Sequence, residues 1–140
     1  MSKTGKIHIS FKSNTANSYW SVLKTLMDNE WSANKYGEIS YMLNGTFDWD
    51  SSPFAAFDTI MLQIKKSIEN NHETSIDLIW KDNMTVIGLL FTTENYMSIS
   101  TPENTKMKDD KSVVDFPFYL EKLSSILSDI KPTDIECVYN

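Results

Sequence analysis

Hydrophobic residues follow two different spacings within the first 30 positions of the chain. Every second residue is apolar over residues 6–12, which predicts a short strand. The spacing lengthens to three and four over residues 16–29, and the side chains of residues 13–15 can cap this segment, so we expect an amphipathic helix. The hydrophobic positions of that helix are Tyr19, Val22, Leu23, Leu26 and Met27.

A hairpin is predicted over residues 38–50. Asn44 and Gly45 both tolerate positive φ, and this dipeptide between two alternating segments is a strong signal for a tight turn. The alternating residues are Ile39, Tyr41 and Leu43 before the turn and Phe47 and Trp49 after it. We therefore expect the apolar face of the hairpin to pack on the core.

Two further helices are predicted, over residues 53–70 and 117–130. Ser-Ser-Pro at positions 51–53 offers a cap followed by a first-turn proline, and Lys-Pro at positions 131–132 ends the last helix. The polar and charged residues 102–112 indicate a loop before that helix.

A three-strand meander is predicted between these two helices. Residues 76–80 alternate, residues 84–93 are apolar almost throughout, and residues 96–100 form a further strand. So continuous an apolar run indicates a central strand covered on both faces, with Trp80 and the 84–91 segment in the core. Residues 135–139 predict a last short strand.

These elements predict one α+β domain over residues 1–140. Short turns join adjacent strands, so the sheet should be mostly antiparallel, with about six to seven strands packed against three helices. The length suits a single core, and no internal repeat interrupts it.

The charge composition narrows the partners that the protein can bind. All thirteen basic residues are lysine, and nineteen acidic residues give a net charge of −6. A nucleic-acid binder without arginine would be unusual, although an AT-rich genome also replaces arginine with lysine. An acidic surface repels polyanions and attracts basic proteins.

The compartment expected for this protein is the cytoplasm. No apolar segment approaches the roughly 20 residues that span a bilayer, and the first residues lack the apolar core of a signal peptide. Cys137 is the single cysteine, so no internal disulfide can form, and its alternation with Ile135 and Tyr139 predicts a buried side chain.

Motifs for cofactor, metal or nucleophile chemistry are missing from the sequence. The four glycines form no phosphate-binding spacing, and His8, His72 and Cys137 are too far apart for a local metal site. We therefore predict no cofactor, no metal site and no catalytic residues.

Asp48 and Asp50 flank Trp49 and form the most suggestive acidic pair. On a strand, residues two apart project from the same face, so both carboxylates would point away from Trp49. They could act as the acid–base pair of a small hydrolase, lie on a merely solvated face, or recognise a basic protein.

A second candidate binding group surrounds Trp31. This residue follows the first helix beside Asp28 and Glu30, and an exposed tryptophan among acidic groups is typical of an interface anchor. The alternative is that Trp31 packs on the end of the core. The candidate partner-binding residues are Asp28, Glu30, Trp31, Asp48 and Asp50.

In size, acidity and aromatic content, the whole chain resembles the immunity proteins of bacterial contact-dependent growth inhibition and related polymorphic toxin systems. The resemblance implies a small cytoplasmic α+β protein that binds and neutralises a cognate toxin domain, often a basic nuclease, without catalysis. The alternatives that remain open are a small hydrolase that uses Asp48 and Asp50, and a non-catalytic adaptor subunit.

Overall fold

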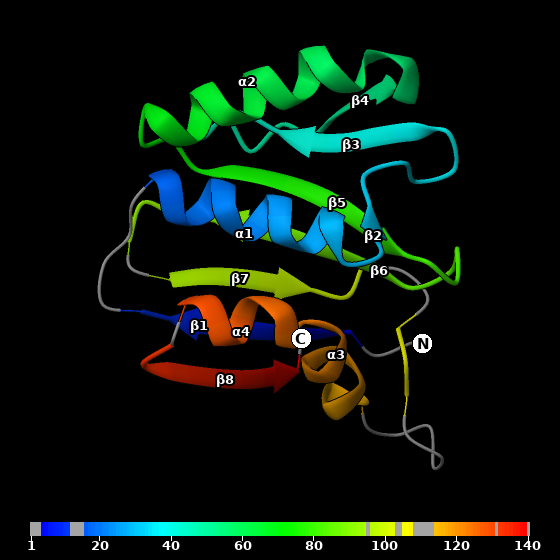
Figure 1. The fold of residues 1–140 in the computed structure, drawn as a ribbon, viewed down its shortest axis with the longest axis vertical. Coiled ribbons are helices and arrows are strands. Elements are labelled where there is room, and N and C mark those ends of the chain that lie inside the picture. The colour runs from blue at the N-terminus through cyan, green and yellow to red at the C-terminus, as the bar shows by residue number, and fades with distance from the viewer. Residues whose placement is uncertain are drawn as a thin grey trace.

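The structure is a computed structural model that describes residues 4–11, 16–94, 96–102, 105–107, 114–130 and 132–139. These residues form an α+β fold in which an antiparallel sheet of eight strands packs against four α-helices (Figure 1). The predicted class is confirmed, although the expected six to seven strands and three helices are too few. The strands are β1 (Gly5–Ser10), β2 (Trp31–Ser32), β3 (Glu38–Met42), β4 (Asp50–Pro53), β5 (Thr74–Trp80), β6 (Val86–Phe91), β7 (Tyr96–Ser100) and β8 (Asp134–Tyr139). The helices are α1 (Ala16–Asp28), α2 (Phe57–Glu69), α3 (Phe116–Lys122) and α4 (Ser124–Ile130), and the 3₁₀ turn η1 (Phe54–Ala56) precedes α2.

The strands lie in the order β4-β3-β5-β6-β7-β1-β8, and β2 pairs with β5. The meander β5-β6-β7 is built as predicted, with antiparallel neighbours joined by short turns. The first strand then inserts between β7 and the last strand. Both ends of the chain therefore contribute to one sheet, and β6 is its central strand.

The helices cover only one face of this sheet, with α1 lying between α2 and α4 (Figure 1). On this helix-covered face, Ile7, Ile76, Leu89 and Ile99 stand side by side on four paired strands and have no exposed surface. Trp80, Ile87, Leu89 and Phe91 lie in the same core, as predicted, but Met84 is exposed because it belongs to the turn that precedes β6. This continuous apolar layer is the main hydrophobic core.

The opposite face, called here the second face, has a different composition. Across the same four strands, the side chains of His8, Ser75, Leu90 and Ser98 are aligned on it. Leu90 is partly exposed there, whereas Ser75 and Ser98 are buried. The expectation that β6 is covered on both faces holds for most of its length, because Val86 and Gly88 on the second face are buried and only Leu90 is partly exposed.

Tyr19 fixes α1 to the turn between β6 and β7. Its hydroxyl lies 2.9 to 3.0 Å from the carbonyl oxygens of Thr92, Glu94 and Tyr96, so its single proton has three acceptors. Burial raises the pKa of Tyr19 to about 12, and the phenol therefore stays protonated as a donor at neutral pH.

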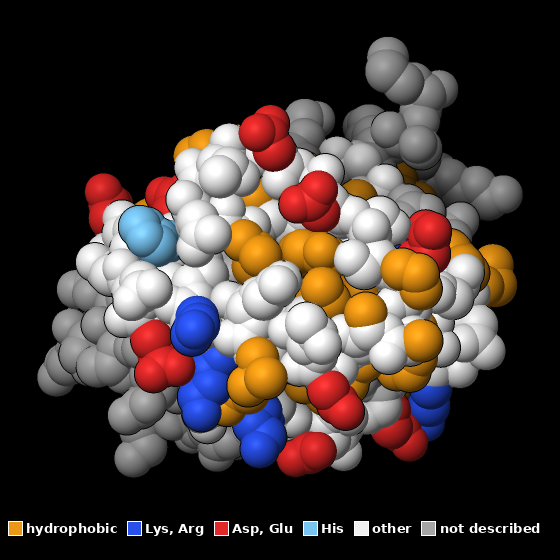
Figure 2. All heavy atoms as spheres, turned by 90° about the horizontal axis from the view of Figure 1, so that it is seen from above, with side chains coloured by type: hydrophobic (Ala, Val, Ile, Leu, Met, Phe, Trp, Pro, Cys, Tyr) orange, Lys and Arg blue, Asp and Glu red, His pale blue; other side chains and the backbone are white. Residues whose placement is uncertain are grey.

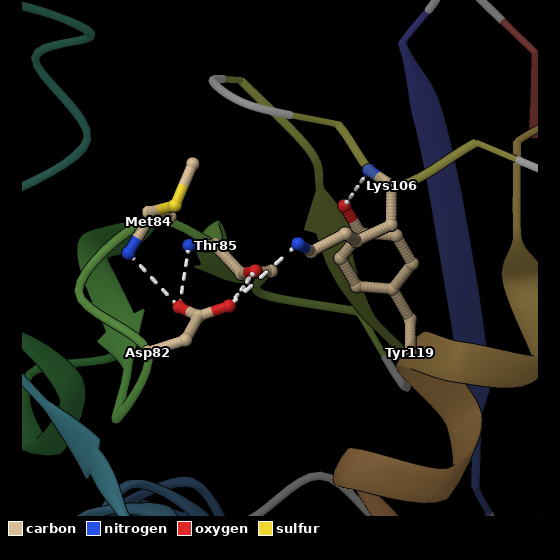
Figure 3. Close-up of polar contacts among 5 residues, drawn as sticks. All are labelled: Asp82, Met84, Thr85, Lys106 and Tyr119. Atoms are coloured by element: carbon tan, nitrogen blue, oxygen red, sulfur yellow. Dashed lines mark hydrogen bonds and ion pairs between the residues drawn. The ribbon is translucent and has the colours of Figure 1, made fainter.

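Asp82 organises the turn between β5 and β6 (Figure 3). Its carboxylate accepts hydrogen bonds from the backbone N–H groups of Met84 and Thr85 and lies 3.7 Å from the ammonium of Lys106. Partial burial acts to raise the pKa of Asp82, but a hydrogen bond from the Thr85 hydroxyl, the two backbone hydrogen bonds and the lysine charge together lower it. The backbone N–H of Lys106 donates in turn to the Tyr119 hydroxyl at 2.8 Å, so the network joins this turn to α3.

Three local expectations need correction. The segment 51–53 forms the edge strand β4 rather than a helix cap, and the predicted last helix divides at Leu123 into α3 and α4. Cys137 is exposed rather than buried, and it lies on β8, which is an edge strand of the sheet. Within the described part of the chain, no helix has the length and apolarity needed to cross a membrane.

Candidate functional site

The predicted tight turn at Asn44-Gly45 exists, but the loop that contains it is longer than the expected two-residue connection. Both residues have positive φ, and the Thr46 N–H donates to the Leu43 carbonyl at 3.2 Å. Strand pairing ends at Tyr41 and Asp50, so residues 43–49 form a loop instead of a two-residue connection.

This loop is anchored at its base. The Asn44 N–H donates to the Ser67 hydroxyl of α2, and the Gly45 N–H donates to the Glu73 carbonyl, both at 2.9 Å. Farther along, the Asp48 N–H donates to the Thr46 hydroxyl at 3.2 Å. The first two contacts anchor the start of the loop to α2 and to Glu73, and the third closes a turn around Phe47.

Phe47 and Trp49 face solvent rather than the core. Phe47 has a φ of 59°, a left-handed conformation that is unfavourable for an aromatic residue, and 65% of its surface is exposed. Trp49 is 53% exposed. The expected packing of both rings on the core is wrong, because the chain leaves the alternating strand geometry at the loop and resumes it only at Asp50.

Asp48 and Asp50 are both exposed beside these rings. Asp50 is the first residue of β4, whereas Asp48 lies in the loop, so the two carboxylates do not share one face of a strand. The geometric basis for the hydrolase hypothesis is therefore lost. What remains is a segment, residues 47–50, in which exposed aromatic and acidic side chains alternate.

Figure 2 views the molecule from the side of α2. Hydrophobic side chains gather at the centre and right of this surface, and acidic side chains border them. The large hydrophobic residues exposed on the 43–49 loop, η1 and α2 are Phe47, Trp49, Phe54 and Leu62. Such a surface is typical of a protein interface, which buries aromatic residues within a polar rim.

A pocket of about 160 Å³ lies on the second face, at the base of this loop. Phe47, Trp49 and Met42 line it together with Leu90, and strands β1, β5, β6 and β7 supply the remaining lining residues. These are Lys6, Ser75, Gly88, Ser98 and Ser100. A Cβ atom at Gly88 would lie 2.8 Å from the Ser100 hydroxyl, so glycine is needed for this close approach.

Asp28 and Glu30 lie elsewhere, in a hollow of about 490 Å³ at the end of α1. Glu30 pairs with Lys81 at 2.7 Å, and both side chains are more than half exposed. Asp28 occupies the last residue of the helix, where a negative charge opposes the helix dipole. A basic group of a partner would be favourable at this position.

Trp31 is part of the core and is only 1% exposed. Its ring lies 5.1 Å from that of Trp80, and its indole N–H donates to the Lys122 carbonyl at 3.1 Å. The expectation of an exposed anchor is wrong, and the packed alternative is correct. Strand β2 places Trp31 opposite Trp80 on the helix-covered face, which sequence spacing alone does not indicate.

The candidate residues therefore form two separate groups. Trp31 pairs with Trp80 at the end of β5, whereas Met42, which precedes the loop, pairs with Ser75 near its start. Asp28 and Glu30 thus lie toward one end of β5, and Asp48 and Asp50 toward the other. Only the second pair adjoins exposed aromatic rings, and it forms the better candidate interface.

The described residues include no group of three or more histidine, cysteine or acidic side chains that could hold a metal. Partial burial raises the pKa of the Cys137 thiol, which lowers the fraction of reactive thiolate at neutral pH. The chain matches no protein-family model, no curated protein and no solved structure.

Proposed function

We propose that this protein is an immunity protein that binds a cognate toxin domain and neutralises it without catalysis. The observation that carries the proposal is the exposed segment 47–50, in which Phe47 and Trp49 alternate with Asp48 and Asp50. The segment extends from an anchored turn on a broad sheet, so a partner would meet a surface that is largely formed in advance.

The chemistry of this segment fits a basic partner such as a nuclease domain. Asp48 and Asp50 can occupy the positions of substrate phosphates against lysine and arginine side chains of the toxin. The faces of Phe47 and Trp49 can stack on guanidinium groups and exclude water from these ion pairs. The net charge of −6 adds long-range attraction.

The size of the protein is sufficient for this role. A standard interface buries about 800 Å² on each partner, roughly a tenth of the 7583 Å² surface of this chain. Occlusion of the toxin's active or substrate-binding site by such an area would block its substrate. The proposal places the protein in the cytoplasm of the cell that produces the toxin.

The proposal predicts that the chain protects cells against a toxin domain encoded beside it. Cells that express this toxin domain should survive with the wild-type chain and die with the double variant Asp48→Lys and Asp50→Lys, because charge reversal makes the binding segment repel a basic surface. Colony counts after induction measure the effect.

A matched control changes the same total charge elsewhere. Glu69→Lys together with Glu136→Lys alters two exposed residues on α2 and β8 and should leave protection intact. Circular dichroism should show that both double variants fold. Hydrolase turnover by the purified chain that Asp48→Asn abolishes, combined with no protection against the toxin, would overturn the proposal.

A further inference from the structure

The pocket on the second face combines an apolar wall with polar groups that lack partners. Lys6 lines it and makes no ion pair with any described residue. Ser98 is only 7% exposed, yet its hydroxyl makes no hydrogen bond within the described part of the chain. The Ser98 hydroxyl and the Lys6 ammonium, which both line the pocket, provide donors that a ligand can use.

Lys6 carries the charge among the residues that line the pocket. The nearest acidic group to Gly88 is Asp77, whose Oδ1 would lie 3.1 Å from a Cβ at that glycine. Asp77 pairs with Lys35 at 2.9 Å, so its charge is balanced. Lys6 then remains as the uncompensated charge among the lining residues, and it favours an anion.

The remaining wall is suited to a flat hydrophobic group. Met42 and Leu90 line the pocket beside the exposed rings of Phe47 and Trp49. The volume of about 160 Å³ is close to that of cavities that hold a single benzene ring. The apolar part of the pocket therefore has room for one aromatic ring.

We propose that this pocket binds a small carboxylate that carries one aromatic ring. The ring packs against Met42, Leu90 and the two loop aromatics, and the carboxylate accepts hydrogen bonds from the Lys6 ammonium and the Ser98 hydroxyl. This inference goes beyond the proposed immunity function. It is tested on the isolated chain, so its failure would leave the toxin proposal untouched.

Phenylacetate is the probe for this proposal, and the signals to follow are the backbone amides of Gly88 and Ser98 and the indole N–H of Trp49 in ¹H–¹⁵N NMR spectra. Phenylacetate should shift all three signals in a saturable manner. Phenethylamine keeps the ring and reverses the charge, and acetate keeps the charge without the ring. Both should bind at least about 10-fold more weakly, because each lacks one of the two interactions.

Lys6→Met keeps most of the apolar stem and removes the charge, so it should weaken phenylacetate binding at least about 10-fold. Lys24→Met, which changes an exposed lysine on α1, should bind as the wild type does. Equal binding of phenethylamine and phenylacetate to the wild-type chain would overturn the proposal, even if Lys6→Met did not fold. Shifts confined to residues outside the pocket would overturn it as well.

Discussion

Leu89→Ala is expected to lower the free energy of unfolding by about 2 to 5 kcal/mol. Leu89 is completely buried on the central strand β6, between Ile76 of β5 and Ile99 of β7. Truncation removes apolar contacts and leaves a cavity that a paired strand cannot close. Urea denaturation followed by circular dichroism measures the change.

Leu90→Ala is the matched control for this substitution. Leu90 belongs to the same strand, but its side chain lies on the second face and is partly exposed. The same truncation should therefore cost clearly less than at Leu89. Equal losses at the two positions would contradict the assignment of the core to the helix-covered face.

Lys35→Met is expected to destabilise the fold by up to about 3 to 5 kcal/mol. Lys35 pairs with Asp77 at 2.9 Å, and their side chains are only 16% and 11% exposed. Removal of the ammonium takes the Lys35 charge away from a carboxylate that is poorly solvated. Thermal and urea unfolding report the loss.

Two further variants test whether the loss of stability comes from a buried charge or only from a broken ion pair. Lys81→Met breaks the exposed pair with Glu30 and should change stability by no more than about 1 kcal/mol. Combining Lys35→Met with Asp77→Leu removes both charges and should recover much of the loss. No recovery in this double variant would show that Asp77 contributes through contacts other than the ion pair.

The regular elements of the fold were predictable because their hydrophobic spacing is clear. Helix α1 and strands β1, β5, β6 and β7 all follow the period expected from their sequences. Strand order was not predicted, because the insertion of β1 between β7 and β8 depends on pairing between distant segments. The two-residue strand β2 is too short to leave a periodic signal.

The candidate site shows where pattern reasoning fails. The Asn44-Gly45 turn was identified correctly, but alternation after it predicted buried Phe47 and Trp49, and the positive φ of Phe47 cannot be read from its residue type. The exposed acidic residues were found, since carboxylates generally face solvent. Their division into two distant groups follows from tertiary structure alone.

The polar side of the pocket on the second face corresponds to a pattern in the sequence. Residues 6–10 and 96–100 both alternate apolar and polar side chains, which indicates that one face of each strand is polar. This alternation places Lys6 on the polar face of its strand, and Ser98 and Ser100 on the polar face of theirs. Their proximity to Gly88 still required the register of four strands.

We propose that the acidic and aromatic segment 47–50 binds a basic toxin domain. The measurement is the association rate constant between the purified chain and a basic toxin domain, where one is encoded beside it, followed by stopped-flow fluorescence at low and high salt. We expect fast association that slows steeply as salt increases, and much slower association for the Asp48→Lys and Asp50→Lys double variant, because charge steering sets the encounter rate. An association rate that is independent of salt and unchanged in this double variant would show that segment 47–50 does not steer binding.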